Sequence, residues 1–228
     1  MKAGRIFGVL VMIGVCALAS ASAKDRGSSS NEYLALGDSV AFGYIDQAGY
    51  EYYNPTNFVN YGDWASLALS LNESNGGCPG ETSGSFLSLT APDNGCRLYR
   101  AHFPLHVVYS SIQSTQFTYA TGFLRTHSDV ALVTVMLGAN DLLLLEEQCN
   151  GDPTCIENGA PQVFAAAEAH MQTILAGLRG TGYTGTIEVV NYYSLDYSDQ
   201  FETELTVGLN QAITAPAAAF GAVVADVF

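Results

Sequence analysis

The sequence predicts an α/β domain built on a parallel β-sheet, and two observations carry this prediction. Short apolar runs alternate along the chain with longer segments of helical periodicity, as in repeated βα units. The apolar runs are continuous, which is typical of strands that helices cover on both faces. The length of 228 residues and the apolar content of 48% suit one packed domain, and the sequence contains no internal repeat or linker.

Five strands and four helices are expected in alternation. The strands are predicted at Tyr33–Gly37, Gly76–Cys78 (a weak one), Val130–Leu137, Thr186–Asn191 and Ala222–Phe228. The helices are predicted at Tyr61–Leu71, Ser114–Thr126, Pro161–Arg179 and Gln200–Phe220. Pro161 suits a first helical turn, where its missing N–H costs nothing. The stretch 73–104 is rich in Gly, Ser, Asn and Pro, which predicts a long loop held by a disulfide.

Residues 1–23 have the features of a secretory signal peptide. Lys2 and Arg5 precede an apolar run from Ile6 to Ala19, and the small residues Ala21-Ser22-Ala23 form an A-x-A cleavage site. The apolar run is short for a membrane span, and no later stretch approaches the roughly 20 apolar residues that a span requires. We therefore expect an extracellular or periplasmic domain, residues 24–228, without stable membrane insertion.

Four cysteines remain after the predicted signal peptide: Cys78, Cys96, Cys149 and Cys155. An even number of cysteines in an exported chain favours disulfides, and three pairings are possible. We expect the two sequence-local pairs, Cys78–Cys96 and Cys149–Cys155, because each closes a short loop rich in Gly, Asn, Asp and Pro. The spacings do not fit a zinc site, so we expect no metal.

The charge balance argues against nucleic acid as a partner. The chain has 8 Lys and Arg against 22 Asp and Glu, and its formal net charge is −14. A protein that binds nucleic acid needs a basic stripe that displaces counterions from phosphates, whereas the basic residues here are scattered. We expect a monomer that acts on a small molecule.

Polar turns follow three of the predicted strands. They are Gly37-Asp38-Ser39, Cys78-Pro79-Gly80-Glu81-Thr82 and Gly138-Ala139-Asn140-Asp141. In an open parallel sheet the ligand lies at the carboxyl ends of the strands, so these turns converge on one crevice. A serine there can act as a nucleophile, and an asparagine amide and a glycine N–H can stabilise an oxyanion. Taken alone, each turn is a weak signal, and for Ser39 alone a helix cap is the better explanation by about two to one.

The order and spacing of the three turns resemble the first three conserved blocks of the SGNH/GDSL hydrolase family. The resemblance is sharpest in YLALGDSVAFGY, GCPGETSGSFL and VTVMLGANDLLLLEEQC, and it extends over residues 33–228. It implies a flavodoxin-like three-layer α/β/α sandwich and the hydrolysis of carboxylic esters without a metal or an organic cofactor. The substrate class stays open, because acyl lipids, acetylated sugars and small esters all fit the motifs.

The same resemblance implies roles for individual residues. Ser39 matches the nucleophile, and Gly80 and Asn140 match the oxyanion donors, together with the backbone N–H of Ser39. We interpret Asp38 and Asp141 as residues that fix the turns.

The fourth block of the family, Asp-x-x-His, has no match in this sequence. The chain reads Ala225-Asp226-Val227-Phe228 where that block would follow the last strand. We therefore expect the catalytic His and its Asp to be absent, and the chain to resemble a C-terminally incomplete member that lacks the last helix. His102 and His106 are weak candidates for a base, whereas His127 and His170 fall in or at the end of predicted helices and are expected to be structural.

Two hypotheses remain open at this stage. The first is a secreted serine esterase or lipase of which this sequence is a fragment. The second is a non-catalytic secreted domain that keeps the pocket and binds an ester or glycan. The aromatic residues Tyr50, Tyr52, Tyr53, Phe58 and Tyr61 suit an acyl or sugar site and core or surface packing equally well.

Overall fold

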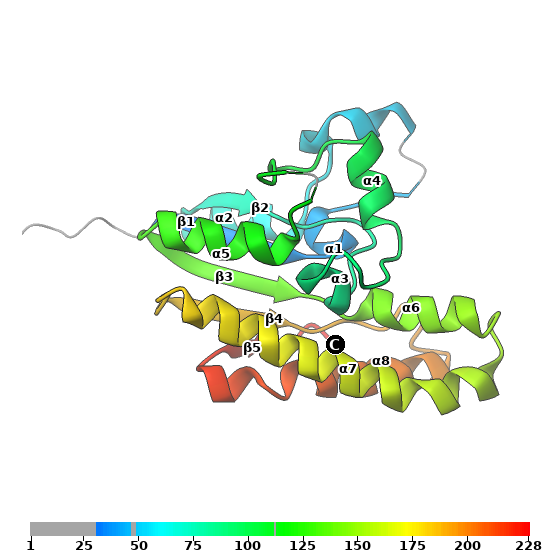
Figure 1. The fold of residues 1–228 in the computed structure, drawn as a ribbon. Coiled ribbons are helices and arrows are strands. Elements are labelled where there is room, and N and C mark those ends of the chain that lie inside the picture. Colours follow the sequence, from blue (N-terminus) through cyan, green and yellow to red (C-terminus); the bar gives the residue numbers. More distant parts are fainter. Residues whose placement is uncertain (1–30, 47–48, 112) are drawn as a thin grey trace, which may run out of the picture.

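Five strands form a parallel sheet in the computed structural model, which describes residues 31–46, 49–111 and 113–228. The strand order is β2-β1-β3-β4-β5, and every neighbouring pair is parallel (Figure 1). This confirms the predicted fold class. The predicted signal peptide, residues 1–23, lies outside the described residues.

The strands differ from the prediction mainly at the sheet edges. They are β1 (Glu32–Gly37), β2 (Asn72–Asn75), β3 (Val130–Met136), β4 (Thr186–Val190) and β5 (Val223–Ala225). β1, β3 and β4 lie within a residue of the prediction at either end. β5 is shorter than predicted.

The second strand was predicted too late in the chain, because β2 is made of polar residues and carries no apolar signal. The predicted stretch Gly76–Cys78 continues the pairing with β1 beyond the end of β2. Gly76 N donates to Ala35 O at 2.8 Å, and Cys78 N donates to Gly37 O at 3.0 Å. The chain therefore reaches the carboxyl edge of the sheet at Cys78.

Helices connect the strands and flank the sheet. The α-helices are α1 (Ser39–Phe42), α2 (Tyr61–Leu69), α3 (Ser83–Leu87), α4 (Cys96–His102), α5 (Gln116–Thr126), α6 (Ala139–Gln148), α7 (Pro153–Gly180) and α8 (Gln200–Thr214). Short 3₁₀ helices lie at η1 (Gly49–Tyr53), η2 (Pro55–Asn57) and η3 (Ala217–Phe220). The last helix was predicted to run through Phe220, but it divides into α8 and η3.

Two predictions about irregular segments were wrong. The stretch 73–104 holds most of β2 and the whole of α3 and α4. These elements are too short to show an apolar periodicity, and α3 begins at a capping box in which the Thr82 side chain accepts from Ser85 N. Helix α7 begins at Pro153, and Pro161 lies inside it. The side chain of Asp152 accepts a hydrogen bond from Cys155 N at 2.8 Å and provides the earlier start.

The two faces of the sheet bury different residues. On one face Tyr33, Ala35 and Leu132 pack against residues of α2 and the turn that follows it. On the other face the larger cluster joins Leu34, Val133 and their neighbours to the buried sides of α5, α7 and α8 (Figure 1). This layering brings the carboxyl ends of β1, β2 and β3 together at one edge.

Both sequence-local disulfides are present. Cys78 is bonded to Cys96, and Cys149 is bonded to Cys155. The first joins the turn after β2 to the start of α4, and the second joins the end of α6 to the first turn of α7.

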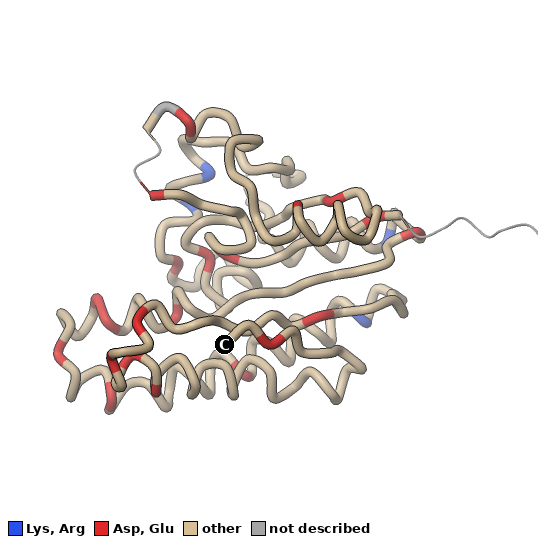
Figure 2. The backbone as a smooth tube through the Cα atoms, turned by 180° about the vertical axis from the view of Figure 1, so that it is seen from behind, with Lys and Arg blue, Asp and Glu red and all other residues tan. Residues whose placement is uncertain are grey.

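Basic residues are few and scattered along the described chain. Figure 2 shows the Lys and Arg residues at separated places along the backbone, among more numerous Asp and Glu residues. Among the helices of the described residues, none combines the length and the hydropathy needed to cross a membrane.

Candidate active site

Ser39 stands where β1 passes into α1. Gly37 ends the strand with φ near +151°, and a Cβ atom there would lie 2.3 Å from the carbonyl oxygen of Met136. Asp38 caps the helix, because its Oδ1 accepts from Val40 N at 2.9 Å. Ser39 is therefore the first helical residue, a position at which the backbone N–H has no partner within the helix. The tight turn places its half-buried side chain at the carboxyl edge of the sheet.

The carboxyl group of Asp38 is buried behind this turn. The hydroxyl of Tyr192, which follows β4, donates to Asp38 Oδ2 at 2.5 Å. The backbone of Tyr192 is itself held on both sides, since Tyr192 N donates to Asn210 Oδ1 at 2.8 Å and Asn210 Nδ2 donates to Tyr192 O at 2.7 Å. Burial raises the pKa of Asp38 to about 6, although both of its hydrogen bonds favour the ionised form. Sequence reasoning identified Asp38 but not its partner Tyr192.

Gly80 lies in the turn after β2, at a position that only glycine fits. Its φ is +83°, and a Cβ atom would lie 2.2 Å from the carbonyl oxygen of Asn94. The loop is closed by a hydrogen bond from Asn94 N to Gly80 O at 2.8 Å and by the Cys78–Cys96 disulfide. In the described chain the N–H of Gly80 donates to no protein acceptor, so it is available to a ligand.

Asn140 enters the same site from the first turn of α6. Its Nδ2 donates one hydrogen to Glu81 O at 3.0 Å, and its Oδ1 accepts from Asn94 Nδ2 at 2.9 Å. These two bonds fix the orientation of the buried amide, and the second hydrogen on Nδ2 has no acceptor in the described chain. Asn140 is thereby tied to the loop that carries Gly80.

A buried pair, Gln116 and Glu81, connects the turn at residues 37–39 with the loop that carries Gly80. Gln116 Oε1 accepts from Gly37 N at 2.7 Å, and Gln116 Nε2 donates to Gly37 O at 3.0 Å and to Glu81 Oε2 at 3.1 Å. The hydroxyl of Ser85 donates to the other carboxylate oxygen of Glu81. Burial raises the pKa of Glu81 to about 7. The amide of Gln116 thus clamps the last residue of β1, and sequence analysis did not single out either member of the pair.

Asp141, the residue after Asn140, is bonded to α3. Its Oδ2 accepts from Ser83 N at 2.8 Å, and its Oδ1 accepts from the Ser83 hydroxyl at 2.7 Å. Because that hydroxyl donates to Asp141, it accepts from Nδ1 of His170 at 2.9 Å. His170 lies in α7. It is connected to Asp141 through the Ser83 hydroxyl, and it makes no bond to Ser39.

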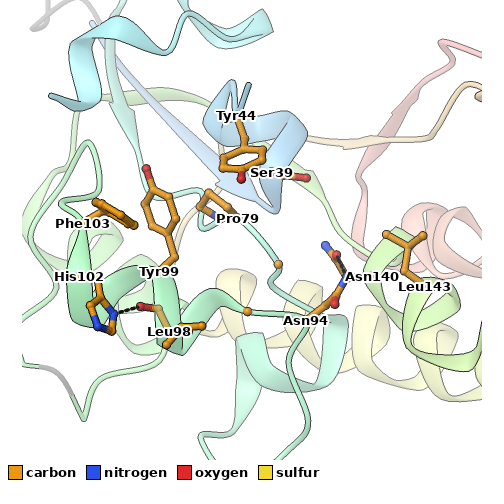
Figure 3. A pocket seen from close by; sticks show the side chains of 12 residues that line it. Ser39, Tyr44, Pro79, Asn94, Leu98, Tyr99, His102, Phe103, Asn140 and Leu143 are labelled. Carbon is orange, nitrogen blue, oxygen red and sulfur yellow. Dashed lines mark hydrogen bonds between the residues drawn. The ribbon is translucent and has the colours of Figure 1, made fainter. Parts of the chain in front are cut away.

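The predicted site residues Ser39, Gly80 and Asn140 line one cavity of about 620 Å³. Figure 3 shows Ser39 and Tyr44 on one side of it, Asn140 and Leu143 on a second, and residues of α4 on a third. Asp38 and Asp141, which we interpret as turn-fixing residues, do not line this cavity. The structure therefore brings three of the predicted residues together and holds the other two behind them.

A second cavity of about 200 Å³ also borders Ser39. It shares Ser39, Asn140 and Leu143 with the first cavity and is bounded by α6, α8 and the segment after β4. Glu146 and Glu202 both line it, and burial raises the pKa of Glu146, with a smaller contribution from the charge of Glu202. Ser39 thus borders both cavities.

Within the described residues, none of the four histidines bonds to Ser39. Nε2 of His106 lies 2.9 Å from Phe42 O, and the ring of His127 stacks on Phe123 with 3.9 Å between centroids. His102 lines the larger cavity, but Figure 3 shows it on the wall far from Ser39, with its Nδ1 2.9 Å from Leu98 O.

One group of potential metal ligands occurs in the described part of the chain: Cys78, Glu81 and Cys96. The two sulfur atoms are joined in the disulfide, so they cannot act as thiolate ligands. The chemistry that the site offers therefore comes from a hydroxyl, an amide and backbone N–H groups.

Comparisons with known proteins agree with this architecture at the level of the fold. No protein-family model matches the sequence, and no curated protein matches it. An extracellular lipase from Streptomyces rimosus is similar in structure at 15% identity and a TM-score of 0.50, over 86% of this chain and 80% of that chain. A variant of an acetyl xylan esterase from Geobacillus stearothermophilus is similar at 12% identity and a TM-score of 0.50, over 87% of this chain and 77% of that chain. These likenesses, with the parallel five-stranded sheet, show that the chain has the SGNH/GDSL hydrolase fold.

Proposed function

We propose that this protein is a serine hydrolase of carboxylic esters. In this function Ser39 Oγ attacks the ester carbonyl, and the developing oxyanion accepts hydrogen bonds from the N–H groups of Ser39 and Gly80 and from Asn140 Nδ2. The observation that carries the proposal is that Ser39, Gly80 and Asn140 line one cavity, with the Gly80 N–H unpaired in the described chain. An acyl-transfer site requires this combination of a nucleophile and convergent donors.

The proposal includes export to an oxidising compartment. Two disulfides support it, because disulfides persist mainly outside the cytosol. The signal-like sequence of residues 1–23 supports it independently.

A second candidate function is the binding of an ester without turnover. It is favoured by one observation: Ser39 Oγ has no hydrogen-bonding partner in the described chain, so no imidazole is in place to take its proton. A serine hydroxyl without a base is a weak nucleophile, although an oxyanion hole alone retains about 10³–10⁴-fold acceleration over water.

A fluorophosphonate probe distinguishes the two functions, because it reacts with activated serines. We expect labelling of Ser39, located by peptide mass spectrometry, and its loss in Ser39→Ala. The matched control is Ser194→Ala, since Ser194 is also a buried serine and it lines neither cavity. Labelling that persists in Ser39→Ala would contradict the assignment of the nucleophile. The second function would be established if the protein bound an ester, was not labelled, and showed no hydrolysis that depends on Ser39.

A further inference from the structure

The hydroxyl of Ser83, the first residue of α3, is bonded to an imidazole and to a carboxylate at the same time. Ser83 Oγ lies 2.9 Å from His170 Nδ1 and 2.7 Å from Asp141 Oδ1. A serine in contact with a histidine and an aspartate has the components of a nucleophilic site. Ser83 is fully buried, however, and it lines neither of the cavities that border Ser39. Any role of these three residues in the reaction is therefore indirect.

The direction of these bonds follows from the groups that Ser83 joins. An ionised carboxylate only accepts hydrogen bonds, so the Ser83 hydroxyl donates its single hydrogen to Asp141 Oδ1. The imidazole then donates to Ser83 Oγ, which places a hydrogen on Nδ1 of His170. The second oxygen of Asp141 accepts from Ser83 N at 2.8 Å. Burial raises the pKa of Asp141, while both bonds from Ser83 favour its ionised form. Both carboxylate oxygens are thus held by one residue, and the hydroxyl of that residue is oriented by His170.

Helix α7 holds His170 against α3. The residues Ala167 and Met171, on either side of His170 in α7, are fully buried, so this part of the helix is anchored in the core. On α3, a Cβ atom at Gly84 would lie 3.3 Å from Cε1 of the His170 ring, so a glycine leaves room for the imidazole against the helix backbone. Figure 1 shows α3 beside α7 and the start of α6. The imidazole therefore connects a fixed helix of the core to the first turn of α3.

Asp141 directly follows Asn140, whose amide lies at the larger cavity (Figure 3). Both residues belong to the first turn of α6, and the residue that precedes this helix, Gly138, provides no side-chain cap. The bonds from Asp141 to α3 therefore anchor a turn that has no cap of its own. The Asn140 amide is anchored a second time by its bonds to Glu81 O and Asn94 Nδ2. The position of the amide thus depends on the loop beside it and, through Asp141, on α3.

We propose that His170 is a positioning residue for the amide of Asn140. It acts through the Ser83 hydroxyl, which in turn holds Asp141. This inference rests on the proposed function, in which Asn140 Nδ2 donates to the oxyanion. Without the hydrogen on His170 Nδ1, the Ser83 hydroxyl loses the donor that orients it, and the first turn of α6 is held less tightly. The loss falls on the stabilisation of the transition state and not on the binding of the substrate.

Two substitutions of similar shape separate the hydrogen bond from the packing of the ring. Both His170→Asn and His170→Leu remove the imidazole, but the asparagine amide offers a donor in the place of Nδ1 and leucine offers none. The side-chain amide signal of Asn140, in NMR spectra of the full chain labelled with nitrogen-15, is identified by its absence in Asn140→Ala. We expect this signal to move in His170→Leu and to stay closer to its wild-type position in His170→Asn. An Asn140 signal that is the same in His170→Leu as in His170→Asn would overturn the proposal.

Kinetics measure the consequence for the reaction. An oxyanion donor that is removed costs about 10²–10³ in kcat and one that is displaced costs less, so we expect kcat for a short p-nitrophenyl ester to fall about 10-fold in His170→Leu with KM unchanged. His170→Asn should recover most of this loss. The matched control is His127→Leu, the same substitution at an exposed histidine that lines neither cavity, and it should leave kcat unchanged. A rise in KM with an unchanged kcat would contradict the positioning role.

A double-mutant cycle tests the route through Ser83. Because His170 acts through the Ser83 hydroxyl, His170→Leu should cause no further loss of kcat when it is added to Ser83→Ala. Losses that add would show that His170 acts by another route. Ser83→Ala also breaks the same connection without changing α7, so it should move the Asn140 signal even if His170→Leu does not fold.

Failure of this inference and failure of the proposed function give different results. If a fluorophosphonate labels Ser39 equally fast in wild type and in folded His170→Leu, only the positioning role is refuted. If the Asn140 signal moves in His170→Leu but Ser39 is not labelled in wild type, the connection from His170 to Asn140 is supported and only the hydrolase is refuted.

Discussion

Replacing Gln116 by leucine should loosen the connection between the turn that carries Ser39 and the loop that carries Gly80. The substitution keeps a similar side-chain volume but removes the amide that bonds to both backbone groups of Gly37 and to Glu81 Oε2. Gly37 O keeps a partner, because Cys78 N also donates to it at 3.0 Å. Two buried groups lose theirs: the N–H of Gly37 and the carboxylate oxygen of Glu81.

The size of the effect follows from these two groups. A buried polar group left unpaired costs about 1–3 kcal/mol, so the free energy of unfolding should fall by about 2–6 kcal/mol. In a domain of this size each kcal/mol lowers Tm by about 2–4 °C, so the smallest expected fall in Tm is about 4–8 °C. The loss should grow as the pH rises through about 7, because the pKa of Glu81 is raised to about 7 and only the ionised carboxylate requires the donor.

Thermal unfolding of wild type and Gln116→Leu at pH 5 and pH 8 measures both effects. Gln113→Leu is the matched control, because it makes the same substitution three residues earlier at an exposed position, and its Tm should stay within about 1 °C of wild type. The rate of fluorophosphonate labelling of Ser39 should fall in Gln116→Leu under conditions where the variant is folded. Equal Tm values for wild type and Gln116→Leu at pH 8 would refute the reasoning about this clamp.

Three further predictions concern neighbouring residues. Asn140→Ala should lower kcat for a short p-nitrophenyl ester by about 10²–10³ with little change in KM, and an effect on KM alone would indicate ground-state binding instead. Glu81→Gln should flatten the pH dependence of the free energy of unfolding. In wild type the stabilising contribution of Glu81 is full below its unfolded pKa of 4.5 and is lost as the pH rises through about 7. In denaturant titrations, the free energy of unfolding of the variant should therefore rise relative to that of wild type between pH 4.5 and 8. Tyr192→Phe should raise the pKa of Asp38 above its value of about 6 and cost about 1–3 kcal/mol in stability, whereas Tyr193→Phe, at a half-exposed neighbour, should change neither; an unshifted Asp38 titration by NMR would refute the role of the hydroxyl.

The parts of the fold that the sequence predicted are those with a local pattern. Continuous apolar runs mark β1, β3 and β4, and glycines mark the turns after β1 and β3, so Ser39 and Asn140 could be placed at strand ends. The position of β2 was not predicted, because this edge strand consists of polar residues and has no apolar run.

The supporting residues of the site were not predictable for a different reason. Tyr192 lies 154 positions from Asp38, and Gln116 lies 79 positions from Gly37, and no local spacing announces such a pair. A buried tyrosine and a glutamine at the start of a helix look like ordinary core and capping residues until the topology of the sheet brings them to the same edge. His170 is similar, because its bond to Ser83 joins helices that are 87 positions apart in the sequence.

The disulfide between Cys78 and Cys96 has a consequence for how specificity can change in this fold. It fastens α4, whose Leu98, Tyr99 and His102 line the larger cavity, directly to the turn that carries Gly80. The cavity-facing side chains of α4 can therefore be exchanged without displacing Gly80, the proposed oxyanion donor, because the two segments share one covalent anchor. A library randomised at these positions would vary the wall of the larger cavity while the turn at Gly80 stays in place.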